Sequence, residues 1–283
     1  MEGRTGEEPA WFNEPCILGI DEAGRGPVLG PMVYGCAFCA LSQKARIAGM
    51  EFADSKTLTE EKRETLFEAL KEDTSIGWAA DVIHAKDLSS QMLRSEKKSL
   101  NAISHDSAMG LIRGALDKGV NLVEVYVDTV GDPEKYEQRL SEKFPGVRMT
   151  VRKKADSLFP IVSAASIVAK VTRDRALRAW VFEERGVEYG RQFGSGYPAD
   201  PETKTWLAAN VDPVFGFPSL VRFSWGTCKP LVAKLCVDVQ WENDDEDESE
   251  STSARKNRRY ESAAPGRHSY FKSRQLQQVT THL

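Results

Sequence analysis

Four acidic residues stand where expected strands or helices begin or end, although they lie far apart along the chain. They are Asp21, Glu22, Asp128 and Asp156. The first two follow one apolar run, the third ends another, and the fourth precedes a long helical segment. In α/β proteins, functional groups gather at the ends of strands, so these side chains are expected to converge. Because clustered carboxylates repel one another, the pattern predicts a site for Mg²⁺ or Mn²⁺, whose preferred ligands are carboxylate oxygens.

The predicted chemistry of such a site is phosphodiester hydrolysis. Two divalent ions about 4 Å apart activate a water molecule and stabilise the leaving oxygen at phosphorus. Each acidic residue also has a simpler explanation when it is taken alone. Asp156 then caps a helix and Asp128 ends a strand, while Asp21 and Glu22 belong to a solvated turn.

A glycine-rich turn follows the first acidic pair. Gly24 and Gly26 allow a close approach of backbone amides to a ligand, and Arg25 adds a cation between them. The turn is therefore suited to hold a sugar or a phosphate. It is not a dinucleotide-binding fingerprint, because Pro27 stands where the required helix would begin.

The elements that position these residues are predicted to alternate between strands and helices, which is typical of an α/β fold. Strands are expected at 16–20, 32–41, 76–83, 122–127 and 147–151. Helices are expected at 57–72, 100–118, from 133 onward, 157–184 and 202–209. Thr57 and Glu60 resemble a capping box at the start of the first helix.

Composition places the chain among intracellular globular proteins. Its 283 residues, 41% of them hydrophobic, are enough for one main domain. No run of eighteen apolar residues predicts a membrane span, and the polar start of the chain does not resemble a signal peptide. Five cysteines lack a metal-binding spacing, so buried free thiols are favoured over a zinc site.

Charge is distributed unevenly, although the formal net charge is −4. Between residues 143 and 178, nine basic residues stand against two acidic ones, a net charge of +7. If these side chains share one face, they can hold several phosphates of a nucleic acid. The alternative is a solvated helix surface. Beyond residue 241, an acidic run and a polar tail lack apolar periodicity, and disorder is expected there.

Several blocks of the sequence, in order, resemble the type 2 ribonucleases H. The blocks are 18–31 (LGIDEAGRGPVLGP), 54–58 (DSKTL), 127–128 (VD), 154–157 (KADS), 163–170 (SAASIVAK), 173–174 (RD) and 194–198 (GSGYP). The resemblance implies a ribonuclease H-like mixed sheet flanked by helices, with a small helical C-terminal subdomain and a disordered tail. It also implies the domain boundaries 1–13 for a flexible N-terminus, 14–225 for the catalytic domain, 226–241 for the end of the subdomain, and 242–283 for the tail.

The resemblance also assigns roles to residues. Asp21, Glu22, Asp128 and Asp156 fall on the family's catalytic, metal-binding carboxylates, which hold two Mg²⁺ or Mn²⁺ ions. Residues of the family that contact the substrate match Gly24, Arg25, Gly26, Tyr197, Lys56 and Arg173. Members of the family cut the RNA strand of RNA/DNA hybrids, and cut 5′ of single ribonucleotides in duplex DNA. Their products carry a 3′-hydroxyl and a 5′-phosphate.

The extension after Trp241 is more similar to the eukaryotic catalytic subunit than to compact bacterial members. That resemblance implies a heterotrimer with two accessory subunits, a nuclear location, and a role in removing ribonucleotides and RNA primers during DNA replication and repair. The aromatic stretch 215–225 and the tail motif 267–271 are candidates for docking these partners. A solvated tail without a partner is the alternative.

Two other functions remain to be compared with a ribonuclease. A nucleic-acid-binding scaffold that has lost catalysis usually lacks one of the carboxylates, whereas all four matching positions are acidic here. A DNA nuclease, transposase or type 1 ribonuclease H uses similar carboxylates on another substrate. The Gly-Arg-Gly turn together with Tyr197 argues against that alternative.

Overall fold

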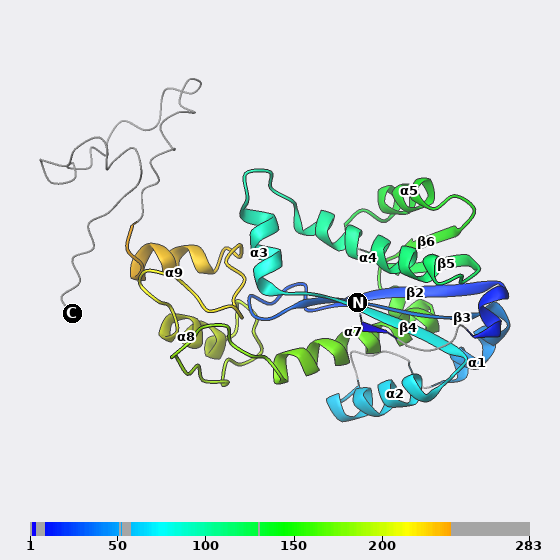
Figure 1. The fold of residues 1–283 in the computed structure, drawn as a ribbon, viewed down its shortest axis with the longest axis horizontal. Coiled ribbons are helices and arrows are strands. Elements are labelled where there is room, and N and C mark those ends of the chain that lie inside the picture. The colour runs from blue at the N-terminus through cyan, green and yellow to red at the C-terminus, as the bar shows by residue number, and fades with distance from the viewer. Residues whose placement is uncertain (1, 4–8, 51, 53–57, 130, 239–283) are drawn as a thin grey trace, which may run out of the picture. The chain divides into compact units, whose positions relative to one another are not determined.

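A mixed sheet forms the centre of the protein in the computed structural model (Figure 1), which describes residues 2–3, 9–50, 52, 58–129 and 131–238. The strands are β1 (Glu2–Gly3), β2 (Cys16–Ala23), β3 (Met32–Ala40), β4 (Ile76–Ile83), β5 (Leu122–Asp128) and β6 (Arg148–Arg152), in the order β1-β4-β3-β2-β5-β6. Neighbours from β1 to β2 are antiparallel, whereas β2, β5 and β6 run parallel. The predicted mixed α/β sheet is confirmed.

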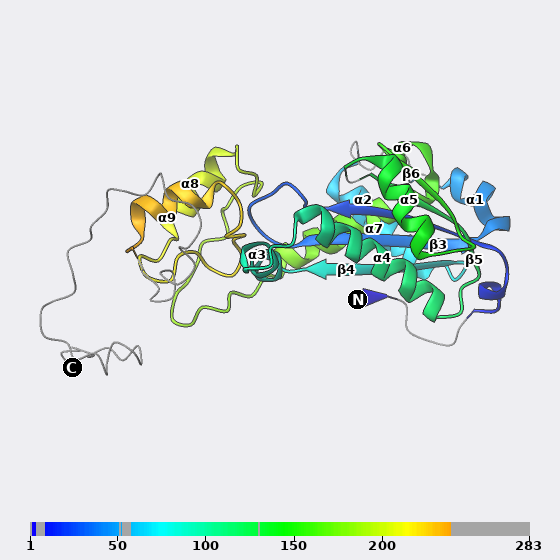
Figure 2. The same cartoon turned by 90° about the horizontal axis from the view of Figure 1, so that it is seen from above.

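Helices cover both faces of the sheet, as Figures 1 and 2 show from two directions. One face packs against α4 (Leu100–Asp117) and α5 (Pro133–Lys143). The other packs against α7 (Pro160–Arg178), α2 (Glu60–Glu72) and α1 (Lys44–Gly49). The strand β3 is buried at every position because it is covered on both sides.

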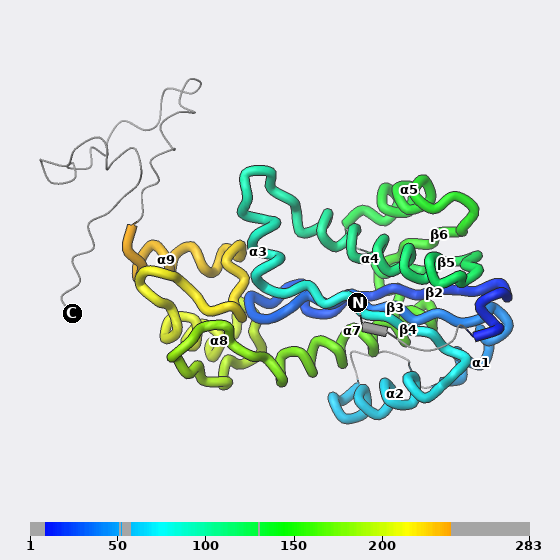
Figure 3. The backbone as a smooth tube through the Cα atoms, viewed as in Figure 1, coloured from blue at the N-terminus to red at the C-terminus, as the bar shows by residue number. Residues whose placement is uncertain are grey.

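A third, smaller core lies beyond the end of the sheet, around α8 (Pro201–Ala209) and α9 (Cys228–Leu235). Trp206, Leu207 and Leu220 pack there against Val28 and Leu29 of the loop that joins β2 to β3. The tube in Figure 3 shows this loop reaching toward α8 and α9. The helical C-terminal part therefore lies directly beside the glycine-rich turn, and this unit extends through Val237.

Some elements differ from the sequence-based expectations. The helix expected at 157–184 is divided into α6 (Ala155–Leu158) and α7, because Phe159 precedes Pro160 and adopts an extended conformation, with φ −126° and ψ 110°. The helix α2 begins at Glu60 and is capped by Thr59, whose side chain accepts from the amide of Lys62. Thr57 lies outside the described residues.

Several elements were not predicted, because they are short or lack a clear period. They are the helices α1, α3 (Ala85–Leu93) and α9, and the 3-10 helices η1 (Ala10–Asn13) and η2 (Leu41–Gln43). Within the segment predicted to be flexible, η1 buries Phe12 against the sheet core. All five cysteines are free thiols, four of them buried, as expected. No helix among the described residues is long and apolar enough to cross a membrane.

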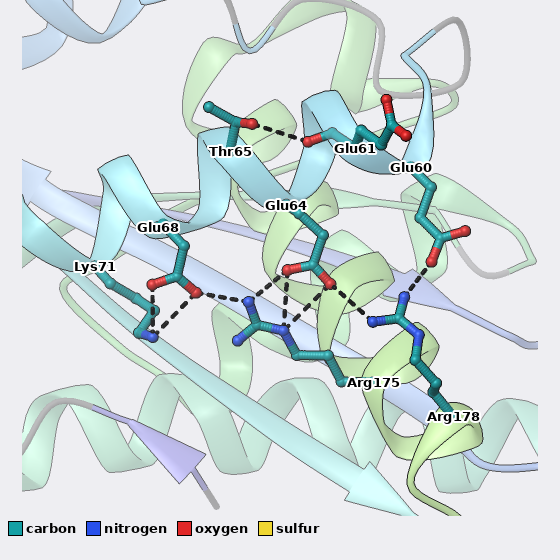
Figure 4. Close-up of polar contacts among 8 residues, drawn as sticks. All are labelled: Glu60, Glu61, Glu64, Thr65, Glu68, Lys71, Arg175 and Arg178. Carbon is teal, nitrogen blue, oxygen red and sulfur yellow. Dashed lines mark hydrogen bonds and ion pairs between the residues drawn. The ribbon is translucent and has the colours of Figure 1, made fainter.

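The basic stretch 143–178 does not present one continuous positive face. Figure 4 shows that Arg175 of α7 binds Glu64 and Glu68 of α2, while Arg178 binds Glu60 and Glu64. Ion pairs also engage Arg148 with Glu124 and Arg152 with Glu137. The charges of these four arginines are therefore largely used within the protein, and the expectation of nine basic residues free to meet phosphates is wrong.

Close packing of α7 on the sheet depends on glycine at position 35 of β3. A β-carbon placed on Gly35 would lie 2.7 Å from the carbonyl oxygen of Ala165 and 2.7 Å from the amide nitrogen of Ala169. We expect Gly35→Ala to lower the free energy of unfolding by about 2 to 3 kcal/mol, because the backbone of α7 has to shift. Urea denaturation followed by circular dichroism measures this change.

The matched control is Gly49→Ala at the end of α1, where an added β-carbon meets nothing within 4 Å. That substitution should change stability by at most about 1 kcal/mol, because it mainly restricts the unfolded chain. Equal effects of the two substitutions would show that the contact between α7 and β3 does not require glycine.

Candidate active site

Three acidic side chains meet at the ends of two parallel strands. Asp21 and Glu22 lie near the end of β2, and Asp128 is the last residue of β5. The register pairs Ile20 with Val127, so the following residues come side by side. One carboxylate oxygen from each acidic residue lies within 4.8 Å of the others. The parallel pairing of β2 with β5 thus gathers residues that are about a hundred positions apart.

The fourth predicted carboxylate, Asp156, is buried beside this group, although it is not one of the three that lie within 4.8 Å. Lys154 turns the chain here with a left-handed φ of 56°, an uncommon conformation for a residue other than glycine. The turn lets the amide of Ala155 donate to Asp128 at 3.1 Å. The hydroxyl of Ser163 donates to the backbone carbonyl of Asp156. Asp156 belongs to α6 and caps neither α6 nor α7.

Burial and mutual repulsion disfavour the charged forms of these acids. Burial, followed by repulsion from Asp128, raises the pKa of Asp21 to about 7, and Asp156 adds to the effect. A hydrogen bond from Ser166 of α7 opposes that rise. Burial, followed by repulsion from Asp21, raises the pKa of Glu22 to about 8.

The donor set fits a hard divalent cation. The side-chain oxygen Oε2 of Glu22 is buried and has no hydrogen-bond partner among the described residues. A buried carboxylate oxygen without a donor is costly unless a cation binds it. Three oxygen ligands close together, with no nitrogen or sulfur ligand in the group, match Mg²⁺ or Mn²⁺ better than zinc.

The glycine-rich turn lies directly after the carboxylate-bearing end of β2. Gly24 has a positive φ of 76°, and an added β-carbon there would lie 2.7 Å from the carbonyl oxygen of Pro31. The guanidinium of Arg25 donates to Ser104 and Asn101 at the start of α4. The side chain of Arg25 is thus held against α4.

Tyr197 lies over this turn. A β-carbon on Gly26 would lie 3.0 Å from the ring carbon Cε1 of Tyr197, so only glycine allows this approach without displacement. The amide of Val28 donates to the carbonyl of Gly196 at 2.8 Å, which ties the two loops together. The ring is 51% exposed and therefore remains available to a ligand.

Of the other predicted contact residues, Arg173 lies beneath the turn and Lys56 lies outside the described residues. Arg173 is largely buried, and its Nε and Nη2 atoms have no hydrogen-bond partner among the described residues. Burial lowers the pKa of this arginine. An added β-carbon on Gly24 would collide with its side chain, so the two residues are in contact. The neighbouring Asp174 pairs with Arg63 of α2 at 3.3 Å, in line with a structural role.

The sequence analysis missed Arg222 and Trp225, which hold the turn from below. Arg222 is fully buried and donates to carbonyl oxygens of the loop between β2 and β3. The indole nitrogen of Trp225 donates to the carbonyl of Gly26 at 3.1 Å. The available signal was a single arginine inside the apolar stretch 214–225, where a charge requires a specific partner.

The chain matches the family model Ribonuclease HII over residues 18–228. A ribonuclease H2 protein of Arabidopsis thaliana, the A subunit, is 56% identical over 288 residues, which cover 96% of this chain and 97% of the relative. The Homo sapiens protein of the same name is 48% identical and covers 95% and 91%. The crystal structure of ribonuclease H2 from Pyrococcus horikoshii OT3 superposes with a TM-score of 0.62 at 31% identity, covering 78% of this chain and 98% of that one.

The fold and the site together define a ribonuclease H-like α/β enzyme with a buried carboxylate centre. Within that class, the chain belongs to the ribonuclease HII family, and it is a ribonuclease H of the eukaryotic type. The resemblance found in the sequence is confirmed.

The raised pKa values predict how the stability of the metal-free protein depends on pH. Asp21 and Glu22 bind protons more tightly in the folded than in the unfolded state, so they favour folding below about pH 4. That contribution is lost as the pH rises through about 7 to 8. We expect metal-free protein to be less stable at pH 8 than at pH 5.5, by on the order of a few kcal/mol. Mg²⁺ should offset much of the loss.

Thermal unfolding with EDTA or with Mg²⁺, at both pH values, measures this effect. The variant Asp21→Asn should show a smaller pH dependence, whereas Glu61→Gln, at an exposed position of α2, should behave as the unaltered protein does. A metal-free protein whose stability rises between pH 5.5 and pH 8 would contradict the repulsion argued for the cluster.

Proposed function

We propose that the protein is an endoribonuclease that cleaves the RNA strand of RNA/DNA hybrids and the 5′ side of single ribonucleotides embedded in duplex DNA. The products are a 3′-hydroxyl and a 5′-phosphate. The observation that carries the proposal is the position of the turn 24–26 and Tyr197 next to three clustered carboxylates. A cleavage centre and a group able to sense a ribose thus lie side by side.

In this proposal Asp21, Glu22, Asp128 and Asp156 hold two Mg²⁺ or Mn²⁺ ions. When bound, such ions activate a water molecule and stabilise charge on the scissile phosphate. The amides of Ala155 and Thr129 donate to Asp128 and orient its carboxylate. Ser166 does the same for Asp21 from α7. The protein therefore supplies ligands whose orientation is set before substrate binds.

Recognition of the ribonucleotide depends on its 2′-hydroxyl, the only group that distinguishes it from its DNA neighbours. The backbone of Gly24, Arg25 and Gly26 can reach that hydroxyl because no side chain at either glycine intervenes. Tyr197 offers a ring face for the sugar and a hydroxyl for hydrogen bonding. Arg173 contributes a positive charge beneath the turn.

Contacts with the duplex backbone are proposed for Lys56, Lys153 and Lys154. Lys153 and Lys154 are exposed in the turn before Asp156, and neither forms an ion pair among the described residues. Lysines at this position can hold phosphates near the cleavage site without reading sequence.

The proposal extends to the setting of the enzyme. Eukaryotic relatives are named as one lettered component of ribonuclease H2, which supports a heterotrimer with two accessory subunits. The proposed substrates arise in nuclear DNA, so we propose a nuclear role in the removal of ribonucleotides and RNA primers during replication and repair.

An exposed apolar patch suits the docking of an accessory subunit. It consists of Val214, Phe215, Leu235 and Val237. Asp212 accepts from the amides of Val214 and Phe215 and so holds the loop in a turn, and Phe215 is 85% exposed. The patch is therefore presented by a loop with a defined conformation.

The end of α9 is joined to this loop, because the amide of Val237 donates to the carbonyl of Pro213. Within the stretch 215–225 proposed from the sequence, Phe217 and Val221 are buried, whereas Phe215 is available. The motif 267–271 lies outside the described residues.

The variant Asp128→Asn tests the reaction. It removes a charged ligand while keeping the shape and the hydrogen bond from Ala155, so we expect loss of cleavage by about 100-fold or more with the fold retained. The assay uses matched duplexes with no, one or four consecutive ribonucleotides, with and without Mg²⁺, for the chain alone and in its complex.

The unaltered enzyme should cut the second and third duplexes only with Mg²⁺, and should leave the all-DNA duplex intact. Cleavage of the all-DNA duplex at a similar rate would favour a general DNA nuclease. Full activity of Asp128→Asn would exclude this residue from metal binding.

The variant Phe215→Ser tests the docking patch. We expect at least about a tenfold loss of affinity for the accessory subunits, because an exposed aromatic side chain at an interface often contributes about 2 kcal/mol or more. Size-exclusion chromatography and binding titrations measure it. Val181→Ser, at an 81% exposed apolar position outside the patch, should leave assembly unchanged. Normal assembly of Phe215→Ser would place the interface elsewhere.

A further inference from the structure

Arg222 is a buried cation whose hydrogen bonds all go to one loop. Its side chain is fully buried, and it donates to the carbonyl oxygens of Gly24 at 2.6 Å, Arg25 at 3.2 Å and Gly30 at 2.8 Å. These acceptors lie almost two hundred residues earlier in the chain. The loop that carries the glycine-rich turn is therefore held by one side chain from the C-terminal part.

No carboxylate within 4.0 Å balances this charge in the part of the chain that the structure describes. Burial, and then the nearby Arg173, lower the pKa of Arg222 to about 9, so it stays charged at neutral pH. An arginine without an acidic partner is a costly way to stabilise a core, because an apolar side chain of similar size avoids its desolvation. Its use here indicates a demand for several hydrogen-bond donors in a fixed arrangement.

Trp225 completes the arrangement. The guanidinium of Arg222 lies 4.7 Å from the centre of the Trp225 ring, and the indole nitrogen donates to the carbonyl of Gly26 at 3.1 Å. Three successive carbonyls of the turn, from Gly24 to Gly26, are thus bound from the same segment.

Binding these carbonyls has a consequence for the amides. In a trans peptide bond the N–H points opposite to the C=O of the same unit. When Arg222 draws in the carbonyls of Gly24 and Arg25, it turns the N–H groups of Arg25 and Gly26 away from itself. Neither N–H donates to an acceptor within the described part of the chain. Two backbone donors are therefore aimed away from the core at the place where Tyr197 covers Gly26.

We infer that Arg222, with Trp225, is a positioning residue for ribonucleotide selectivity: it fixes the direction of the two N–H donors that the turn offers to a ribose 2′-hydroxyl. The inference rests on the proposed function and adds to it the residues that preorganise the sensing turn. Arg222 touches neither the substrate nor the carboxylates in this role. Its loss should act on the choice between ribose and deoxyribose, and less on general affinity for a duplex.

The experiment measures binding without cleavage. In the Asp128→Asn background, the full chain in its complex is titrated with two duplexes of the same sequence, one all-DNA and one carrying a single ribonucleotide. The readout is the ratio of the two dissociation constants. We expect Arg222→Met to reduce this ratio by about tenfold, with little change in the constant for all-DNA. Arg222→Lys, which keeps the charge but not the fork of donors, should also lose most of the ratio.

Arg191 provides a matched control in the same part of the protein. It also donates to two backbone carbonyls, those of Arg178 at 3.0 Å and Trp180 at 2.7 Å, but neither belongs to the turn. Arg191→Met should leave the ratio unchanged even if stability falls. Trp225→Phe keeps a ring beside Arg222 and removes only the donor to Gly26, so it gives a milder loss of the ratio if Arg222→Met does not fold.

The outcomes separate the two levels of the argument. If Asp128→Asn alone binds both duplexes equally, the proposed ribonucleotide selectivity fails. If it prefers the ribonucleotide and the ratio survives in Arg222→Lys and Trp225→Phe, the positioning role is overturned. Equal losses in Arg191→Met and the Arg222 variants would also overturn it, because general destabilisation would then explain the effect.

Discussion

The repulsion among buried carboxylates is the constraint on which the rest of the structure depends. Three acidic side chains lie within 4.8 Å of one another at the ends of β2 and β5, with a fourth, Asp156, beside them. An arrangement of this kind destabilises the folded state unless protons or cations neutralise it. The protein accepts that cost at one place and stabilises the surroundings with extensive packing, since β2 and β3 are covered by helices on both faces.

The surrounding elements serve to hold that arrangement. Glycine at position 35 lets α7 lie close to β3, and Ser166 of α7 reaches Asp21. The left-handed turn at Lys154 aims the amide of Ala155 at Asp128. Local strain and tight packing therefore occur where the carboxylates have to be oriented, as expected for a site organised before its ligand binds.

Positive charge is arranged in two distinct ways. Arg175 and Arg178 pair with glutamates of α2 on a partly exposed surface, where such pairs add little stability but fix how two helices lie. Arg173 and Arg222, by contrast, are buried beneath the glycine-rich turn, and Arg222 has no acidic partner within 4.0 Å among the described residues. The carboxylate centre is thus followed along the chain by a turn resting on two buried cations.

The sequence by itself determined the α/β class, most strands and long helices, the acidic positions and the glycine-rich turn. Those features follow from local periodicity, residue type and an ordered set of motifs, and the match of residues 18–228 to one family model confirms the family. Local patterns did not reveal the break at Phe159, the short helices α1, α3 and α9, or the pairing of basic residues with α2. Only the tertiary structure decided that Arg222 and Trp225 hold the turn, because hydrogen bonds across almost two hundred residues leave no periodic trace in the chain. Parallel pairing of β2 and β5 likewise decided which acids meet, since strand order is set by long-range packing.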